Sequence, residues 1–178
     1  MRLSRLFLIL PLVLCGCISS KEELLGPDSR VLPFLPGTKF EIYRREQARE
    51  PWVKDSDTAA VTADASLVVR ELDNKGKLKD YPRYTFHSLG FERFLAQGQY
   101  DPKGPYSYSL LEVRNGEGIL VPFDCKKIDQ QAFKAAGGTV DKDNVCFIDG
   151  LADKLGFLKT LAANPVGDQY RYVPVRNK

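Results

Sequence analysis

Residues 106–123, "YSYSLLEVRNGEGILVPF", predict a β-hairpin around which the rest of the chain can be organised. Asn115-Gly116 is a preferred pair for a two-residue type I′ turn, because both central positions of that turn need positive φ. The apolar stretches on either side of the pair therefore predict two antiparallel strands. A two-residue turn would place Arg114 opposite Glu117, as a cross-strand pair of opposite charges.

The first arm of this hairpin has an irregular apolar pattern. Tyr106, Tyr108 and Leu110 follow a period of two, and the pattern then shifts to Leu111 and Val113. Such a shift predicts a β-bulge. The alternative is a regular strand that is buried on both faces.

Segments on both sides of the hairpin have the composition of strands and short helices. Alternating or β-branched stretches separated by turn residues predict strands, and Asp129 is a candidate N-cap for a first helix. A second helix is expected to open at Asp149 or Gly150. The strands are expected at residues 39–45, 66–72, 81–88, 91–99, 145–148 and 169–173. The predicted fold is α+β: an antiparallel β meander, in one alternative curled toward an open barrel, followed by two short helices and a final strand.

The first residues have the layout of a secretory signal. Arg2 and Arg5 supply a positive start, the apolar run "LFLILPLVL" follows, and Gly16 is a small residue. This run is shorter than the roughly 20 residues that a membrane-spanning helix needs. Pro11 would also interrupt the hydrogen bonds of such a helix.

The sequence Leu14-Cys15-Gly16-Cys17 resembles the lipobox of bacterial lipoproteins. The resemblance covers the first 17 residues and implies cleavage between Gly16 and Cys17, a diacylglyceryl thioether on Cys17 and an acyl chain on the new amino end. In that family an Asp after the acceptor favours retention at the inner membrane. Ile18 stands there instead, which implies an outer-membrane anchor facing the periplasm. A Cys-x-Cys metal site is disfavoured, because soft metals need further Cys or His ligands.

The resemblance and the composition together predict three segments. Residues 1–16 form the signal peptide, residues 17–38, rich in Ser, Gly and Pro, form a lipidated tether, and residues 39–178 form a single globular domain. Leu32, Phe34 and Leu35 are apolar, so part of the tether is expected to lie along the surface of the domain. The net charge of +3 includes two arginines of the signal. The densest basic run, "KGKLK" at residues 75–79, is expected to be a solvated loop, so no nucleic-acid partner is predicted.

Cys125 and Cys146 remain as an even pair in an exported domain, and they predict a disulfide. Neither residue has a nearby His or a Cys-x-x-Cys partner that would indicate a metal or catalytic site. The closed loop predicts a stabilisation of about 3 kcal/mol.

The sequence offers few candidates for catalysis. His87 is the only histidine, and Ser88 beside it would point to the opposite face of a strand, so we expect a half-exposed histidine without a catalytic role. Asp55-Ser56-Asp57 and residues 141–144 lack further metal ligands and are expected to be polar turns. We expect no metal, no cofactor and no enzymatic activity.

The expected protein is therefore a membrane-anchored bacterial envelope lipoprotein, held by lipid on Cys17. Its body would be a non-catalytic binding or assembly module with an envelope protein as partner. One alternative is a small-ligand carrier with a barrel-like pocket, which an apolar cavity lined by Phe and Tyr would favour. The other is a cell-wall hydrolase, which two buried carboxyls in one cleft would favour.

Overall fold

The computed structural model describes residues 17–175, apart from residues 63, 65, 73–77 and 80–81. The largest unit in these residues is a β-barrel. Its strands are β3 (Lys39–Arg45), β4 (Val53–Val61), β5 (Leu67–Leu72), β7 (Arg83–Gly90), β8 (Arg93–Gln99), β9 (Tyr106–Arg114), β10 (Glu117–Pro122) and β13 (Gln169–Pro174).

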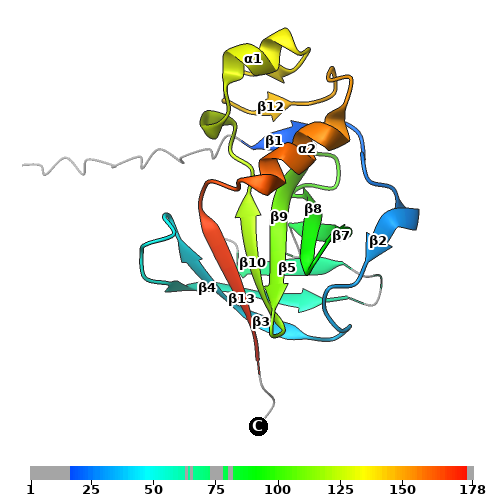
Figure 1. Cartoon of the computed structure of the whole chain (residues 1–178). Coiled ribbons are helices and arrows are strands. Elements are labelled where there is room, and N and C mark those ends of the chain that lie inside the picture. The colour runs from blue at the N-terminus through cyan, green and yellow to red at the C-terminus, as the bar shows by residue number, and fades with distance from the viewer. Residues whose placement is uncertain (1–16, 63, 65, 73–77, 80–81, 176–178) are drawn as a thin grey trace, which may run out of the picture.

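These eight strands form a closed ring (Figure 1). Hydrogen-bonded neighbours follow the order β10-β13-β3-β4-β5-β7-β8-β9, all of them antiparallel, and β9 pairs with β10 to complete the circle. The predicted antiparallel, β-rich fold is confirmed. The barrel is closed rather than open, because the final strand β13 lies between β10 and β3 and leaves no unpaired edge there.

The connection from β10 to β13 carries the helices. It contains η2 (Cys125–Lys127), α1 (Gln130–Ala135), β11 (Thr139–Val140), β12 (Cys146–Phe147) and α2 (Lys154–Ala163). The Asp129 carboxylate accepts hydrogen bonds from the first turn of α1, as predicted. Helix α2 begins later than expected, because its N-cap is Asp153, whereas Asp149 accepts a hydrogen bond from Lys21 N.

The hairpin of β9 and β10 has the predicted turn and register. Asn115 and Gly116 have φ of 54° and 81°, and Arg114 lies opposite Glu117. The side chains of this pair bind elsewhere, however. Arg171 donates to the Glu117 carboxylate at 2.7 Å, and Arg114 lies 3.9 Å from Glu112.

The predicted bulge in β9 is absent from the described residues, because both ladders of β9 run in unbroken register. The alternative, a strand buried on both faces, is correct. Tyr108 and Leu110 face outward and are covered by other elements, while Leu111 and Val113 face the barrel interior. The apolar pattern of β9 changes after Leu110, because the elements that cover the outer face of the barrel end there.

Two apolar clusters therefore share the barrel wall. The inner cluster fills the barrel and is made of Phe34, Phe40, Ile42, Ala59, Val61, Leu67, Val69, Tyr84, Phe86, Ala96, Leu111, Leu120 and Tyr172. The outer cluster joins Leu95, Tyr108 and Leu110 to the helices and the cysteines. An eight-stranded barrel is just wide enough for side chains to fill its interior.

Strand β4 is not predicted from the sequence, and Asp55 and Asp57 are expected in a turn. Both residues lie in this strand instead. Strand β4 pairs with β3 along most of its length, but only Thr58 to Val61 also pair with β5. The first half of β4 therefore has a neighbour on one side only. It is exposed and polar, and it lacks a clear alternation of apolar and polar residues. Residues 75–77 of the lysine-rich run lie outside the described residues, and Leu78–Lys79 form β6, which pairs with β5.

The segment expected to be a tether, residues 17–38, is part of the folded body. It contains β1 (Ile18–Ser20), η1 (Pro27–Ser29) and β2 (Arg30–Val31). Strand β1 lies between β9 and β12, and β2 pairs with the part of β7 that β5 leaves open. The prediction of a tether is therefore wrong for the described residues, since Ile18, Leu25 and Phe34 are buried. Leu32 and Leu35 of the same segment are exposed.

Phe34 is the residue of this segment that enters the inner cluster. Its ring centroid lies 4.8 Å from that of Phe40 and 6.3 Å from that of Phe86. Gly118 makes room for it, because a Cβ at that position would lie 2.7 Å from the Phe34 ring. The barrel interior is thus completed by a side chain from outside the barrel strands.

We expect Phe34→Ala to lower the free energy of unfolding by about 3–5 kcal/mol, because it leaves a cavity in the inner cluster. Urea titration of the intact protein measures this change. The matched control is Leu35→Ala, which truncates a side chain that is 79% exposed and should have an effect within about 0.5 kcal/mol. Equal, small effects of both variants would mean that residues 17–38 do not pack as described.

Candidate functional site

Cys17, the expected lipid acceptor, lies on the surface directly before β1. Cys17 is partly exposed, whereas Ile18 is completely buried. The Cys17 backbone forms a bridge with Asp124, and its carbonyl accepts a hydrogen bond of 3.0 Å from Cys146 N. Ile18 N donates to Phe123 O at 3.1 Å. The backbone is therefore fixed from the acceptor position onward.

Cys125 and Cys146 form the predicted disulfide, and the structure brings it next to Cys17. Cys125 follows Asp124, the bridge partner of Cys17, and Cys146 donates to the Cys17 carbonyl. The disulfide thus links the two segments that hold Cys17. We call these four residues, Cys17, Asp124, Cys125 and Cys146, the Cys17 site.

Charges of both signs surround the Cys17 site. Lys126 and Lys127 are exposed on η2, directly after Cys125. Burial raises the pKa of the Asp168 carboxyl, and neighbouring carboxylates, including that of Asp124, raise it further. The mixture gives this surface no strong preference for an anion or a cation.

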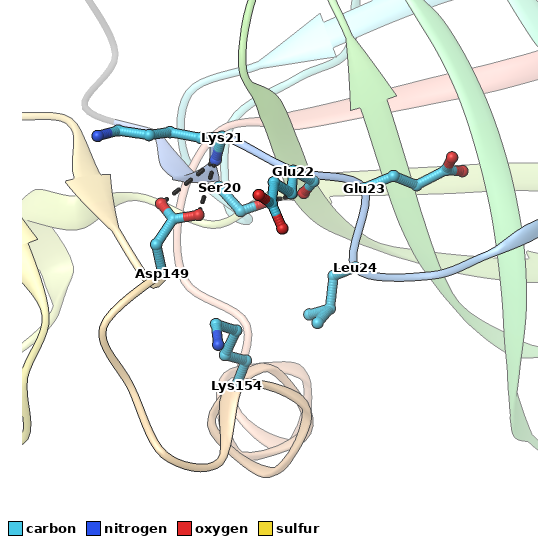
Figure 2. A pocket seen from close by; sticks show the side chains of 7 residues that line it. All are labelled: Ser20, Lys21, Glu22, Glu23, Leu24, Asp149 and Lys154. Atoms are coloured by element: carbon cyan, nitrogen blue, oxygen red, sulfur yellow. Dashed lines mark hydrogen bonds between the residues drawn. The ribbon is translucent and has the colours of Figure 1, made fainter.

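A groove of about 330 Å³ lies between residues 20–24 and the start of α2 (Figure 2). Asp149 crosses it, since its two carboxylate oxygens accept from Lys21 N at 3.0 and 3.2 Å. The remaining charged side chains are those of Lys21, Glu22, Glu23 and Lys154. The groove is open and carries three carboxylates and two lysines, and one of the carboxylates is held by the Lys21 backbone, so its chemistry does not select one class of ligand.

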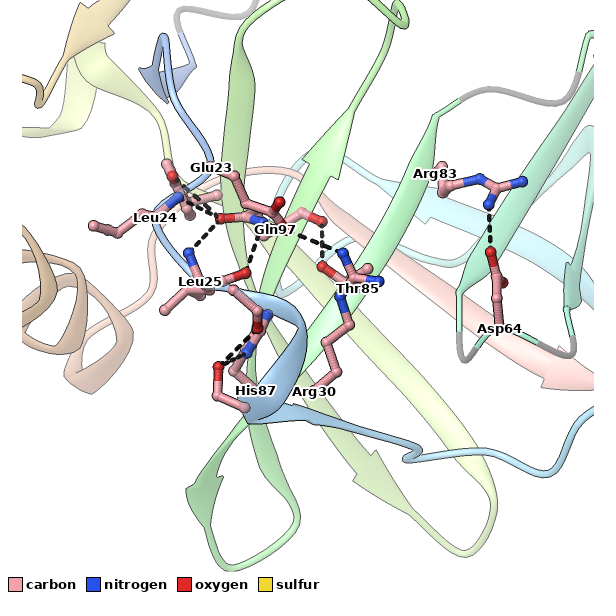
Figure 3. Close-up of polar contacts among 12 residues, drawn as sticks. Glu23, Leu24, Leu25, Arg30, Asp64, Arg83, Thr85, His87 and Gln97 are labelled. Carbon is pink, nitrogen blue, oxygen red and sulfur yellow. Dashed lines mark hydrogen bonds and ion pairs between the residues drawn. The ribbon is translucent and has the colours of Figure 1, made fainter.

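Gln97 on β8 attaches the N-terminal segment to the outer face of the barrel (Figure 3). Its side-chain carbonyl accepts from Leu24 N and Leu25 N at 3.1 and 3.0 Å, and its amide donates to Leu25 O and to Glu23. Gln97 is 3% exposed, and its two contacts with the Leu25 backbone are buried. This role of Gln97 is not predictable from the sequence, because its partners are more than 70 positions away.

His87 lies under the same segment and is 5% exposed, so the prediction of a half-exposed histidine is wrong. Arg30 of β2 pairs with it, and Ser29 Oγ lies 2.8 Å from its Nδ1. Its Nε2 is buried without a hydrogen-bond partner among the described atoms. Burial lowers the pKa of His87, and a hydrogen bond with the Ser29 backbone only partly opposes this. Ser88 is exposed, and the two residues do not form a nucleophile–base pair.

The carboxylate-rich segments do not converge on a metal site. Asp141 Oδ1 accepts from Asp143 N and Val145 N, which confirms the predicted polar turn. Asp55 in β4 lies 4.0 Å from Arg44. Within residues 17–175, with the gaps given above, no group of three His, Cys, Asp or Glu could hold a metal ion. No helix in this part of the chain is long and apolar enough to cross a membrane.

We expect the stability of the protein to fall as the pH decreases below 6.5, the ordinary pKa of a histidine. The unfolded chain binds a proton at His87 near that pH, and the folded chain binds it only at lower pH, so protons favour the unfolded chain. Urea titrations above and below pH 6.5 measure this dependence. His87→Gln removes the only histidine of the chain and should flatten it. The same slope in both proteins would show that His87 is not the titrating group.

Comparison with known proteins identifies no relative: no protein-family model, curated protein or solved structure matches this chain.

Proposed function

We propose that this protein is a bacterial envelope lipoprotein, anchored to the outer membrane through lipid on Cys17, whose barrel is a non-catalytic binding or assembly module. The observation that carries the proposal is the lipobox-like sequence Leu14-Cys15-Gly16-Cys17. It follows an apolar segment that is preceded by two arginines. Two or more acyl chains on one residue give stable anchoring, whereas a single chain binds only marginally.

Two features of the structure support this proposal. The Cys17 residue is partly exposed at the surface, as modification requires. The Cys125–Cys146 disulfide suits an oxidising compartment such as the periplasm, because cytosolic proteins rarely keep one. Both features are compatible with export.

A non-catalytic role is supported by the placement of the polar residues. His87 is buried away from Ser88, and the Asp141 carboxylate is used by its own turn. The apolar side chains of Phe91 and Leu35 are exposed and belong to neither apolar cluster. We therefore propose an envelope protein as the partner of the barrel.

The two alternatives receive less support. A carrier needs an apolar cavity, but the aromatic rings of Phe34, Phe40 and Phe86 pack against one another inside the barrel. A hydrolase needs two carboxyls that face each other in a cleft. The raised pKa of Asp168 belongs to a residue on the exposed surface.

We expect labelled palmitate to enter the wild-type protein in a bacterial host and not to enter Cys17→Ala. The matched control is Cys15→Ala, which should be labelled like the wild type, because Cys15 leaves with the signal. Mass spectrometry should find the mature amino end at a modified Cys17, and density-gradient separation of membranes should place the protein in the outer membrane. Labelling of Cys17→Ala, or its loss in Cys15→Ala alone, would contradict the assignment.

Replacing Ile18, the residue after the proposed lipid acceptor, is a poor test of whether this protein is sorted to the inner or the outer membrane. Ile18 is completely buried in β1, so Ile18→Asp would bury a carboxylate and damage the fold. Fractionation of the unaltered protein avoids this complication.

A further inference from the structure

The N-terminal segment fixes the distance between the proposed lipid and the barrel. A flexible coil of about 20 residues, as expected from the sequence, would have an end-to-end distance of about 25 Å. The structure leaves no such coil, because Cys17 is itself paired with Asp124 and Ile18 is the first residue of β1. Any group attached to Cys17 is therefore attached directly to the folded body.

The elements around Cys17 are also held together. Strand β1 pairs with β9 on one side and with β12 on the other. Strand β12 is joined through Cys146 to Cys125, at the start of η2. The acceptor thus cannot swing away from the barrel without breaking backbone pairs on both sides.

From this geometry we propose that the barrel lies against the phospholipid surface in one fixed orientation, with β1, β12 and η2 at the headgroups. The inference rests on the proposed lipidation of Cys17. The headgroup layer is about 5–8 Å thick. Acyl chains on the sulfur and the amino group of Cys17 must enter the hydrocarbon below that layer, so Cys17 and the residues paired with it lie within or next to the layer.

The opposite end of the barrel points away from the membrane. Strand β9 pairs with β1 through Tyr106 and Ser107, and its other end is Arg114. The distance from Ser107 to Arg114 along an extended strand is about 24 Å. Figure 1 shows the last residues of β13 at the end of the barrel opposite β1 and β12. The surface available to a partner in the periplasm is therefore this distal end.

The covalent attachment, rather than charge, sets this orientation. The exposed Lys126 and Lys127 favour anionic lipids, but Asp124 and Asp168 beside them oppose this attraction. The same orientation is therefore expected on neutral and on anionic bilayers.

The test places a fluorescent probe at each end of the lipidated full-length protein. Lys126→Cys and Arg114→Cys each add one reactive thiol at an exposed site, since Cys17 carries lipid and the other cysteines are paired. The proteins are reconstituted in vesicles of phosphatidylethanolamine and phosphatidylglycerol that contain a headgroup-linked nitroxide. We expect the probe at position 126 to be quenched several-fold more than the probe at position 114. Equal quenching would overturn the inference.

Two controls separate the possible failures. A Gly/Ser-rich insertion between Cys17 and Ile18 should leave the protein on the vesicles and abolish the difference between the probes; a difference that persists would overturn the role of direct attachment. Flotation with the vesicles reports the lipid anchor itself. A protein that does not float refutes the proposed lipidation and the orientation together, whereas a protein that floats with equally quenched probes refutes the orientation alone. Unchanged thermal unfolding shows that the variants are folded.

Discussion

The docking of residues 17–38 along the barrel is the contact on which the rest of the structure depends. Gln97 binds the backbone at Leu24 and Leu25, β2 fills the part of β7 that β5 leaves unpaired, and Phe34 completes the inner cluster. The barrel is closed by its own strands, but its interior and part of its outer face are completed by the N-terminal segment. Removing this segment would expose apolar surface on both faces of the wall.

This docking brings together two features that are far apart in the sequence. Cys17 and the Cys125–Cys146 disulfide meet at one end of the barrel, where the disulfide joins the two segments that bind the Cys17 backbone. In general, a disulfide stabilises a fold mainly by restricting the unfolded chain. Here the disulfide also links the two segments that bind the backbone of Cys17. The position proposed for the lipid is therefore part of the folded body.

Local signals in the sequence predict the β9–β10 turn and the first helix correctly, whereas the bulge in β9 and the turn at Asp55 are wrong. The Asn115-Gly116 turn and the Asp129 cap depend on neighbouring residues, and the disulfide follows from the count of cysteines. The role of the N-terminal segment is not predictable in this way. Its prolines and glycines resemble a linker, and its binding partner Gln97 lies more than 70 positions away. Burial of His87 was missed for the same reason, since a distant segment covers it.

Hydrogen exchange at the amide of Ile18, measured in the intact mature protein, tests most directly whether the N-terminal segment belongs to the fold. This amide donates to Phe123 O, and the amides of Cys146 and Ile148 donate to carbonyls of the same segment. The structure predicts that all three exchange as slowly as amides in β8 and β9. Exchange of the Ile18 amide at the rate of an unstructured peptide would contradict the account.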